Sequence, residues 1–350
     1  MDNNDSKSKL LPVSNNIGWK LMQSSVTPAN NVLSPFNLET TFTFLSQMAS
    51  GSTKTEFLSS FSSDQKIDKI KQVFLSLNDD SVKNILFFLS NQKLKKSFSS
   101  LAKKWKCNIG NDPLQVNKIA EKQTNGLIKQ VIDKPDTDNS YLLCITYFLS
   151  DWVTALKKQG KRTFHLASGD ELQTEFVYYN FDSLKYGEND GSSFVVMPYK
   201  NGYEAMLVLP DTDPASFIKQ NSAESLLSMY DKGEPYKVDV SVPEFEIESN
   251  FEMVKAFKDL GINEAFDENT ADFSNVFKKQ HYITDIIHKA RIKFDGKGTE
   301  AAAVTAVTLT KSKCLVSVNK KRFKANRPFV VFIIQPETRV ILFATTVYKP

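Results

Sequence analysis

The chain has 350 residues, of which 41% are hydrophobic and 11% aromatic, and this composition supports a large folded core. With 13 glycines and 13 prolines, the protein is neither collagen-like nor of low complexity. The formal net charge of +4 is too small to indicate a nucleic acid partner by itself, and we expect none.

The first half of the chain predicts mainly helices. Ser34-Pro35 predicts an N-cap with proline at the first helical position, followed by apolar periodicity to Met48 and a stop at Gly51. Thr53-x-x-Glu56 has the form of a capping box for the next helix. Apolar spacing predicts further helices at residues 67–77, at 98–105 and at 115–133, the last with a break at Thr124-Asn125-Gly126.

The second half predicts mainly strands. The stretch 141–149 is almost continuously apolar, which is typical of a strand covered on both faces. Similar runs occupy residues 203–209, 329–334 and 340–346, and three valines alternate with polar residues over 238–242. A helix is predicted at 251–260. Because no internal repeat or flexible linker divides the chain, we expect one mixed α+β domain.

The cysteines and the first residues bear on the cellular compartment. Cys107, Cys144 and Cys314 lie far apart without metal-like spacing, and an odd number disfavours a fully paired disulfide framework. The first residues lack the apolar stretch of a signal peptide, and no run is long enough to span a bilayer. We therefore expect no membrane partner and a protein that is cytoplasmic or released without a conventional signal peptide.

The common catalytic motifs are absent from the sequence. It contains no Gly-x-Ser-x-Gly elbow, no His-Glu-x-x-His pair and no phosphate-binding loop. His288 lies in the apolar stretch 282–294, where a hydrogen-bonded core histidine is favoured over a catalytic base. A hydrolase stays formally open because triads assemble in space, but we expect no enzymatic activity, metal or cofactor.

One segment does not fit an ordinary domain. From Thr299 to Thr310 there is no proline and only one charged residue, Glu300. In an extended chain, small to apolar side chains would share one face: Thr299, Ala301, Ala303, Thr305, Val307 and Leu309. The alanines could equally begin a helix. The segment is thus compatible with loop, helix and strand, and the alternative to a conformational switch is a plain edge strand or hinge loop.

The stretch KFDGKGTEAAAVTAV resembles the hinge of inhibitory serpins. Six further motifs follow the order and spacing of that family: Asn31-Val32-Leu33-Ser34-Pro35, Thr124-Asn125-Gly126, the strand from Leu142 to Trp152, Asp272-Phe273-Ser274, His288-Lys289-Ala290 and Asn326-Arg327-Pro328-Phe329. The chain is therefore identified as serpin-like over nearly its whole length.

The resemblance implies a fold and a mechanism. The fold would be a single serpin-like domain over residues 1–350, with three β-sheets, about eight or nine helices and an exposed reactive-centre loop at about 296–319. The chain would inhibit serine proteases as a suicide substrate: the protease cuts the loop and forms a covalent acyl-enzyme, and residues 299–311 insert into the main sheet. The implied hinge consists of Gly298, Thr299, Glu300, Ala301, Ala302, Ala303 and Val304, and the implied sheet-opening region of Ser34, Asn37, Cys144, Trp152 and His288.

The family's usual loop length places the reactive bond at Lys311, Ser312 or Lys313. A lysine would suit a trypsin-like or other basic-specific protease, whereas Ser312 would suit a protease with a small pocket. The implied partner is a serine protease held covalently by a monomer. The alternatives are a non-inhibitory serpin (carrier, chaperone or storage protein) and an inhibitor of cysteine proteases.

Residues 311–327 carry seven basic side chains and no acidic one, which is typical of a solvated face or of a polyanion-binding surface. Three other positions depart from the family pattern. Cys144 stands where an asparagine usually bonds the histidine that matches His288, and the amide of Asn37, in place of a second serine, could replace that partner. Gly296 stands where a glutamate is expected, which could loosen the hinge.

Overall fold

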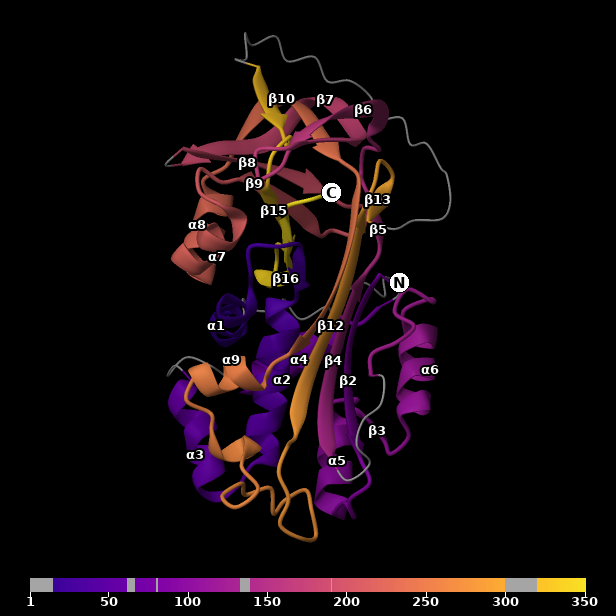
Figure 1. Ribbon diagram of the computed structural model, residues 1–350, viewed down its shortest axis with the longest axis vertical. Helices are drawn as coiled ribbons and strands as arrows, with labels where there is room; N and C mark the ends of the chain where they lie inside the picture. The colour runs from indigo at the N-terminus through magenta and orange to yellow at the C-terminus, as the bar shows by residue number, and fades with distance from the viewer. Residues whose placement is uncertain (1–14, 62–66, 80, 133–138, 190, 300–319) are drawn as a thin grey trace, which may run out of the picture.

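The computed structural model describes residues 15–61, 67–79, 81–132, 139–189, 191–299 and 320–350. They form an elongated α+β fold with most helices toward one end and the C-terminal strands toward the other (Figure 1). The described helices are α1 (Asn16–Ser25), α2 (Pro35–Met48), α3 (Gly51–Ser60), α4 (Ile67–Ser76), α5 (Lys96–Lys104), α6 (Pro113–Gln123), α7 (Pro214–Gln220), α8 (Ala223–Asp231), α9 (Val254–Asp259) and the 3₁₀ helix η1 (Glu264–Phe266). None of them is long and apolar enough to cross a membrane.

The described strands are β1 (Asn31–Leu33), β2 (Val82–Ser90), β3 (Asn108–Gly110), β4 (Ser140–Phe148), β5 (Ser150–Asp151), β6 (Lys157–His165), β7 (Glu171–Asn189), β8 (Ser192–Pro198), β9 (Glu204–Leu209), β10 (Glu234–Pro243), β11 (Phe245–Glu252), β12 (Asp285–Phe294), β13 (Gly298–Thr299), β14 (Lys321–Lys324), β15 (Phe329–Gln335) and β16 (Val340–Val347). Hydrogen bonds join these strands into two sheets rather than three separate ones. The reason is β7, whose 19 residues pair with β6 and β10 and, farther along, with β8.

The helices predicted after Ser34, at 67–77 and at 98–105 are confirmed, whereas the helix predicted at 115–133 ends at Gln123 and Gly51 begins α3 instead of ending α2. The Ser34 Oγ accepts a hydrogen bond from the Asn37 N–H at 3.1 Å and caps α2, as the Ser-Pro pair predicts. The predicted capping box at Thr53 is wrong, because α3 begins at Gly51 and Thr53 lies inside its first turn. The Glu56 carboxylate instead accepts the N–H groups of Asn263 and Glu264 at the start of η1, at 2.8 and 2.9 Å.

The strand predictions are confirmed at β4, β9, β10, β15 and β16. The helix predicted at 251–260 is shorter than expected and spans only Val254–Asp259, because Phe251 and Glu252 end β11. The strands that pattern alone missed include β2 and β6. The sequence of β2 is an apolar run with no clear period, and β6 is rich in charged residues because it forms an exposed edge.

The seven-stranded sheet, ordered β3-β2-β4-β12-β13-β5 with β11 on β12, is covered on both faces. On β4, Leu142, Cys144 and Phe148 belong to the main core, which also contains buried residues of α2. Leu143 and Ile145 belong to a second core together with residues of α6. This alternation confirms that β4 is buried on both sides, and burial of each such aliphatic side chain stabilises the fold by about 1.5–3 kcal/mol.

Candidate functional site

The hinge enters the seven-stranded sheet at its upper end in Figure 1. Beyond β12 the chain turns, and Gly298 and Thr299 form β13 between β12 and β5. The Asp295 Oδ1 holds this turn by accepting the N–H groups of Lys297 and Gly298, at 2.8 and 3.2 Å. The first two predicted hinge residues are therefore already part of the sheet, whereas Glu300, Ala301, Ala302, Ala303 and Val304 lie outside the described residues.

Neighbouring backbone atoms leave no room for a side chain at the two glycines of the turn, Gly296 and Gly298. A Cβ on Gly298 would lie 2.1 Å from the carbonyl oxygen of Ser150, so that only glycine fits against β5 at this position. A Cβ on Gly296 would lie 2.9 Å from the carbonyl oxygen of Leu156, and the Gly296 N–H donates to Glu244 at 3.3 Å. Although Gly296 lacks the carboxylate that the family uses, Glu244 and Asp295 supply carboxylates to this turn.

Two aromatic side chains support the turn and β13. The Trp152 ring stacks on the Tyr199 ring at a centroid distance of 4.0 Å, and its indole N–H donates to the carbonyl oxygen of Asp295 at 3.0 Å. The Tyr199 hydroxyl lies 2.7 Å from the Thr299 hydroxyl, which is fully buried. We call Trp152, Tyr199, Asp295, Gly298 and Thr299 the hinge cluster.

A second group lies lower in the same sheet, where β4 and β12 pair in parallel. Cys144 and His288 are register partners, and the Cys144 Sγ lies 3.4 Å from the His288 Nδ1. The Ser34 backbone N–H donates to the His288 Nε2 at 3.0 Å. We call Ser34, Asn37, Cys144, Thr146 and His288 the polar cluster. Four of the five residues predicted for the sheet-opening region thus meet here, and the fifth, Trp152, belongs to the hinge cluster.

Burial sets the protonation of this pair. Because Ser34 donates to Nε2, the neutral His288 carries its proton on Nδ1 and donates to the Cys144 sulfur. Burial lowers the pKa of His288 to about 3 and raises the pKa of the Cys144 thiol to about 12. His288 is therefore a hydrogen-bonded core residue, as predicted, and both groups stay neutral across the physiological pH range.

The predicted bond from Asn37 to His288 is wrong. Both ring nitrogens already have partners, and the Asn37 amide instead donates to the Thr146 Oγ1 at 2.5 Å and to the Ile145 carbonyl oxygen at 3.0 Å. Asn37 therefore fastens α2 to β4. The amide nitrogen of the neighbouring Asn84 on β2 is buried and has no hydrogen-bond partner among the described residues.

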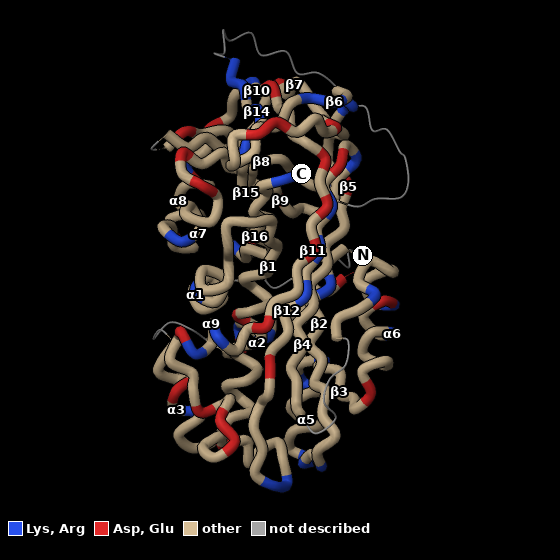
Figure 2. The backbone as a smooth tube through the Cα atoms, viewed as in Figure 1, with Lys and Arg blue, Asp and Glu red and all other residues tan. Residues whose placement is uncertain are grey.

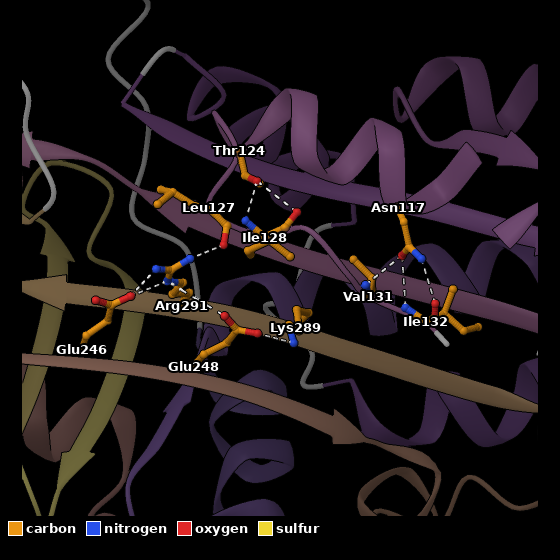
Figure 3. Close-up of polar contacts among 10 residues, drawn as sticks. All are labelled: Asn117, Thr124, Leu127, Ile128, Val131, Ile132, Glu246, Glu248, Lys289 and Arg291. Atoms are coloured by element: carbon orange, nitrogen blue, oxygen red, sulfur yellow. Dashed lines mark hydrogen bonds and ion pairs between the residues drawn. The ribbon is translucent and has the colours of Figure 1, made fainter. Parts of the chain in front are cut away.

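The segment after α6 is fastened to the other face of the sheet (Figure 3). The Asn117 side chain bonds the backbone at Val131 and Ile132, at 2.8 and 2.9 Å. On β12, the Arg291 guanidinium bonds the carbonyl oxygen of Leu127 and the carboxylate of Glu246, and the neighbouring Lys289 pairs with Glu248 at 2.5 Å. This cover is therefore tied to β12 itself.

The reactive-bond residues Lys311, Ser312 and Lys313 lie outside the described residues, as does the first part of the basic stretch 311–327. In the described part, Lys320 pairs with Asp239 at 2.6 Å and Lys321 with Glu188 at 3.1 Å. Figure 2 shows Lys and Arg positions on and near β14, at the same end of the molecule as the basic strand β6. The cationic character of the stretch is thus partly neutralised by acidic neighbours.

The family model for serpins (serine protease inhibitors) matches residues 12–350. This chain therefore belongs to the serpin family. An uncharacterized serpin-like protein of Thermococcus kodakarensis is 31% identical over 242 residues, which span 67% of this chain but only 56% of the relative. A serine protease inhibitor of Cyanea capillata is 24% identical over 97% of this chain and 98% of its own length.

Solved structures show the same fold. The thermophilic serpin tengpin in its native state matches with a TM-score of 0.86 and 24% identity, over 100% of this chain and 96% of its own. Human thyroxine-binding globulin matches with a TM-score of 0.83 and 21% identity, over 96% and 98%. The fold is thus shared between a family named for protease inhibition and a member named for binding thyroxine.

Proposed function

We propose that this serpin inhibits serine proteases as a suicide substrate, with cleavage near Lys311–Lys313 and insertion of residues 299–311 into the seven-stranded sheet. The observation that carries the proposal is β13, because two hinge residues already lie between β12 and β5. Thr299, the first residue of the predicted inward face, is fully buried.

The strand directions supply a driving force for insertion. β12 and β4 pair in parallel over six register positions, whereas β13 is antiparallel to β12. A continuation of β13 between them would therefore replace one parallel ladder with two antiparallel ladders, which are slightly more stable per residue. Each added hydrogen bond contributes about 0.5–1.5 kcal/mol. At about 3.3 Å per residue, inserting residues 299–311 would carry an attached protease about 40 Å and distort its catalytic site before the ester is hydrolysed.

The hinge composition separates this proposal from its alternatives. A carrier, chaperone or storage serpin has no need of small side chains in the hinge, and thyroxine-binding globulin shows that the fold also serves a protein named for binding thyroxine. Here the inward positions from Thr299 to Thr305 carry only threonine and alanine. The lysines at 311 and 313 would suit the acidic specificity pocket of a trypsin-like protease.

The test is incubation with trypsin-like and other serine proteases, followed by denaturing electrophoresis. We expect a covalent complex that survives SDS, and mass spectrometry of the released C-terminal peptide to place the cut within Lys311–Lys313. Cleavage without complex by every protease tested would favour the non-inhibitory alternative, and complexes with cysteine proteases alone would favour cross-class inhibition.

A matched pair of hinge variants tests insertion itself. Ala303→Arg places a charged side chain on the predicted inward face, while Ala302→Arg places the same charge on the outward face. Both leave the lysines near the reactive bond intact. We expect Ala303→Arg to be cleaved with at least a tenfold loss of complex, and Ala302→Arg to retain it. Equal loss in both variants would contradict strand insertion with this register.

We further propose that the protein is a monomer. It would act in the cytoplasm or after release without a conventional signal peptide. A polyanion would bind the basic stretch 311–327, reinforced by the exposed Lys157, Lys158, Lys161 and Arg162 of β6. Because exposed charges are screened by salt, heparin affinity should fall steeply between low and physiological ionic strength, and a salt-independent affinity would contradict this surface.

A further inference from the structure

Cys144 and His288 face each other across the boundary at which β4 and β12 would separate. Two hydrogen bonds of the Cys144 sulfur go to β12: Sγ accepts from the His288 Nδ1 and donates to the Ile287 carbonyl oxygen, each at 3.4 Å. The other ring nitrogen of His288 is held by Ser34 at 3.0 Å. When β12 moves away, the thiol therefore loses both of these partners together, while β4 keeps its pairing with β2.

In the closed sheet this thiol is protected. Cys144 and His288 are both fully buried, and burial holds the thiol in its neutral form, whereas the thiolate is the reactive species. An electrophile thus has neither a path to the sulfur nor a nucleophile to react with. Both conditions change once the strands separate, because the sulfur then faces the gap and its pKa returns toward that of an ordinary cysteine.

The same face of the sheet also holds an unused hydrogen-bond donor. Asn84 on β2 is the register partner of Thr146, which lies two residues beyond Cys144 on β4 and therefore on the same face. Asn84 is only 3% exposed, and its amide nitrogen has no partner among the described residues. The face of β4 that carries Cys144 therefore holds a hydrogen-bond donor that the closed sheet leaves unpaired.

We propose that Cys144 is a thiol modification site for small electrophiles such as hydrogen peroxide, reached only when β4 and β12 separate, and that modification there blocks strand insertion. The opening step rests on the proposed function. In the reaction the thiolate attacks one peroxide oxygen, the S–O bond forms as the O–O bond breaks, and water leaves: Cys-SH and H₂O₂ give Cys-SOH and H₂O. Sulfur is oxidised and peroxide is reduced. The added oxygen occupies the tightly packed space under the strands, so that neither β12 nor an inserted strand can pair there.

Access to the thiol is tested with the full chain by peptide-level mass spectrometry of N-ethylmaleimide labelling. Cys107 is the internal control, since it is also buried, with 8% exposure, but does not face the boundary between β4 and β12. Below the unfolding transition we expect Cys144 to be labelled at least tenfold faster than Cys107. Equal rates, or no labelling of Cys144 until the chain unfolds, would overturn the proposal.

The consequence for function is tested after peroxide treatment in a Cys314→Ser chain, with each protein compared with its own untreated sample. We expect treated Cys314→Ser to form at least tenfold less SDS-stable complex, and dimedone to capture a sulfenic acid at Cys144. Cys314→Ser/Cys144→Asn should not change on treatment, and Cys144→Ser replaces Cys144→Asn if that chain does not fold. Unchanged complex formation in treated Cys314→Ser overturns the proposal. If untreated protein forms no complex with any protease, the proposed function fails, and the Cys144 to Cys107 labelling ratio still decides whether the site exists.

Discussion

Different kinds of contact hold the two ends of the boundary at which β12 adjoins β13 and β4. At the upper end the hinge cluster joins stacked aromatic rings to a glycine in van der Waals contact with β5, and a strand position there is already occupied by β13. Lower down, in the polar cluster, a hydrogen bond between a thiol and an imidazole joins β4 to β12, and an amide fastens α2 to β4. The upper end therefore combines aromatic packing with a few hydrogen bonds, whereas the lower end depends mainly on buried polar partners, so that substitutions at the two ends should differ in their effects.

The largest effect is expected in the hinge cluster. Trp152→Ala removes a buried indole that contacts Tyr199 and Phe294, and loss of a buried tryptophan costs about 3–5 kcal/mol. Trp105→Ala is the matched control, since Trp105 is equally buried but packs on Phe44 and Phe74, away from the hinge. Urea unfolding should show similar losses in both.

Protease trapping separates these two tryptophan variants. Only Trp152→Ala should also lower the yield of SDS-stable complex, measured at a temperature where both chains remain folded. If both variants trap protease equally well, the aromatic support of the hinge has no part in insertion.

In the polar cluster we expect a smaller loss of stability. Asn37→Ala leaves the Ile145 carbonyl and the Thr146 hydroxyl without their amide partner in a fully buried site, which should lower the free energy of unfolding by about 2 kcal/mol. Thermal unfolding measures this, with Gln173→Ala as a control whose exposed amide donates to the Thr163 hydroxyl at 2.8 Å. Unchanged thermal stability of Asn37→Ala would show that α2 is not fastened to β4 in this way.

Asp285, at the start of β12, destabilises the folded protein at neutral pH. Burial, and secondarily the nearby Glu252, raise the pKa of Asp285 to about 6, so that the folded state holds a proton at pH values where the unfolded state has lost it. This destabilises the fold increasingly from about pH 4 to 6 and fully above that. Asp285→Asn should therefore stabilise the protein by about 1–2 kcal/mol at pH 8, after allowance for its partial exposure, and by nothing at pH 3.5.

Comparing pH profiles then isolates His288. The pKa of His288 is lowered to about 3, so that below pH 6.5 the unfolded state takes up a proton that the folded state refuses. The stability that neutral His288 contributes is fully present above pH 6.5. Below pH 6.5 it falls by at most about 1.4 kcal/mol for each unit by which the pH is lowered. In Asp285→Asn the opposing slope is gone, and the loss between pH 6 and 4 should be steeper than in the unmodified chain. Parallel profiles would contradict both assignments.

These regions also show how far sequence alone can go. Ser34, Trp152 and His288 were predicted as site residues because each stands in a local motif. Tyr199 was missed because its links to the hinge are long-range: its ring stacks on Trp152, and its hydroxyl contacts Thr299, 100 residues farther along the chain. Thr146 was missed for the same reason. The capping box at Thr53 failed because Glu56 found long-range partners in η1, and long-range packing of this kind leaves no local pattern.

The smallest effect is expected from a single oxygen in the hinge cluster. Tyr199→Phe keeps the ring stacked on Trp152 and removes only the hydroxyl that lies 2.7 Å from Thr299, so that stability should fall by about 1 kcal/mol. Thr299→Val removes the other partner of the same hydrogen bond. In a double-mutant cycle by urea unfolding, the combined variant should cost less than the sum of the two single losses, because each removes one bond in common. Additive losses would mean that Tyr199 supports β13 through its ring alone, and the hinge would then be held in the sheet by shape without any side-chain hydrogen bond between Tyr199 and Thr299.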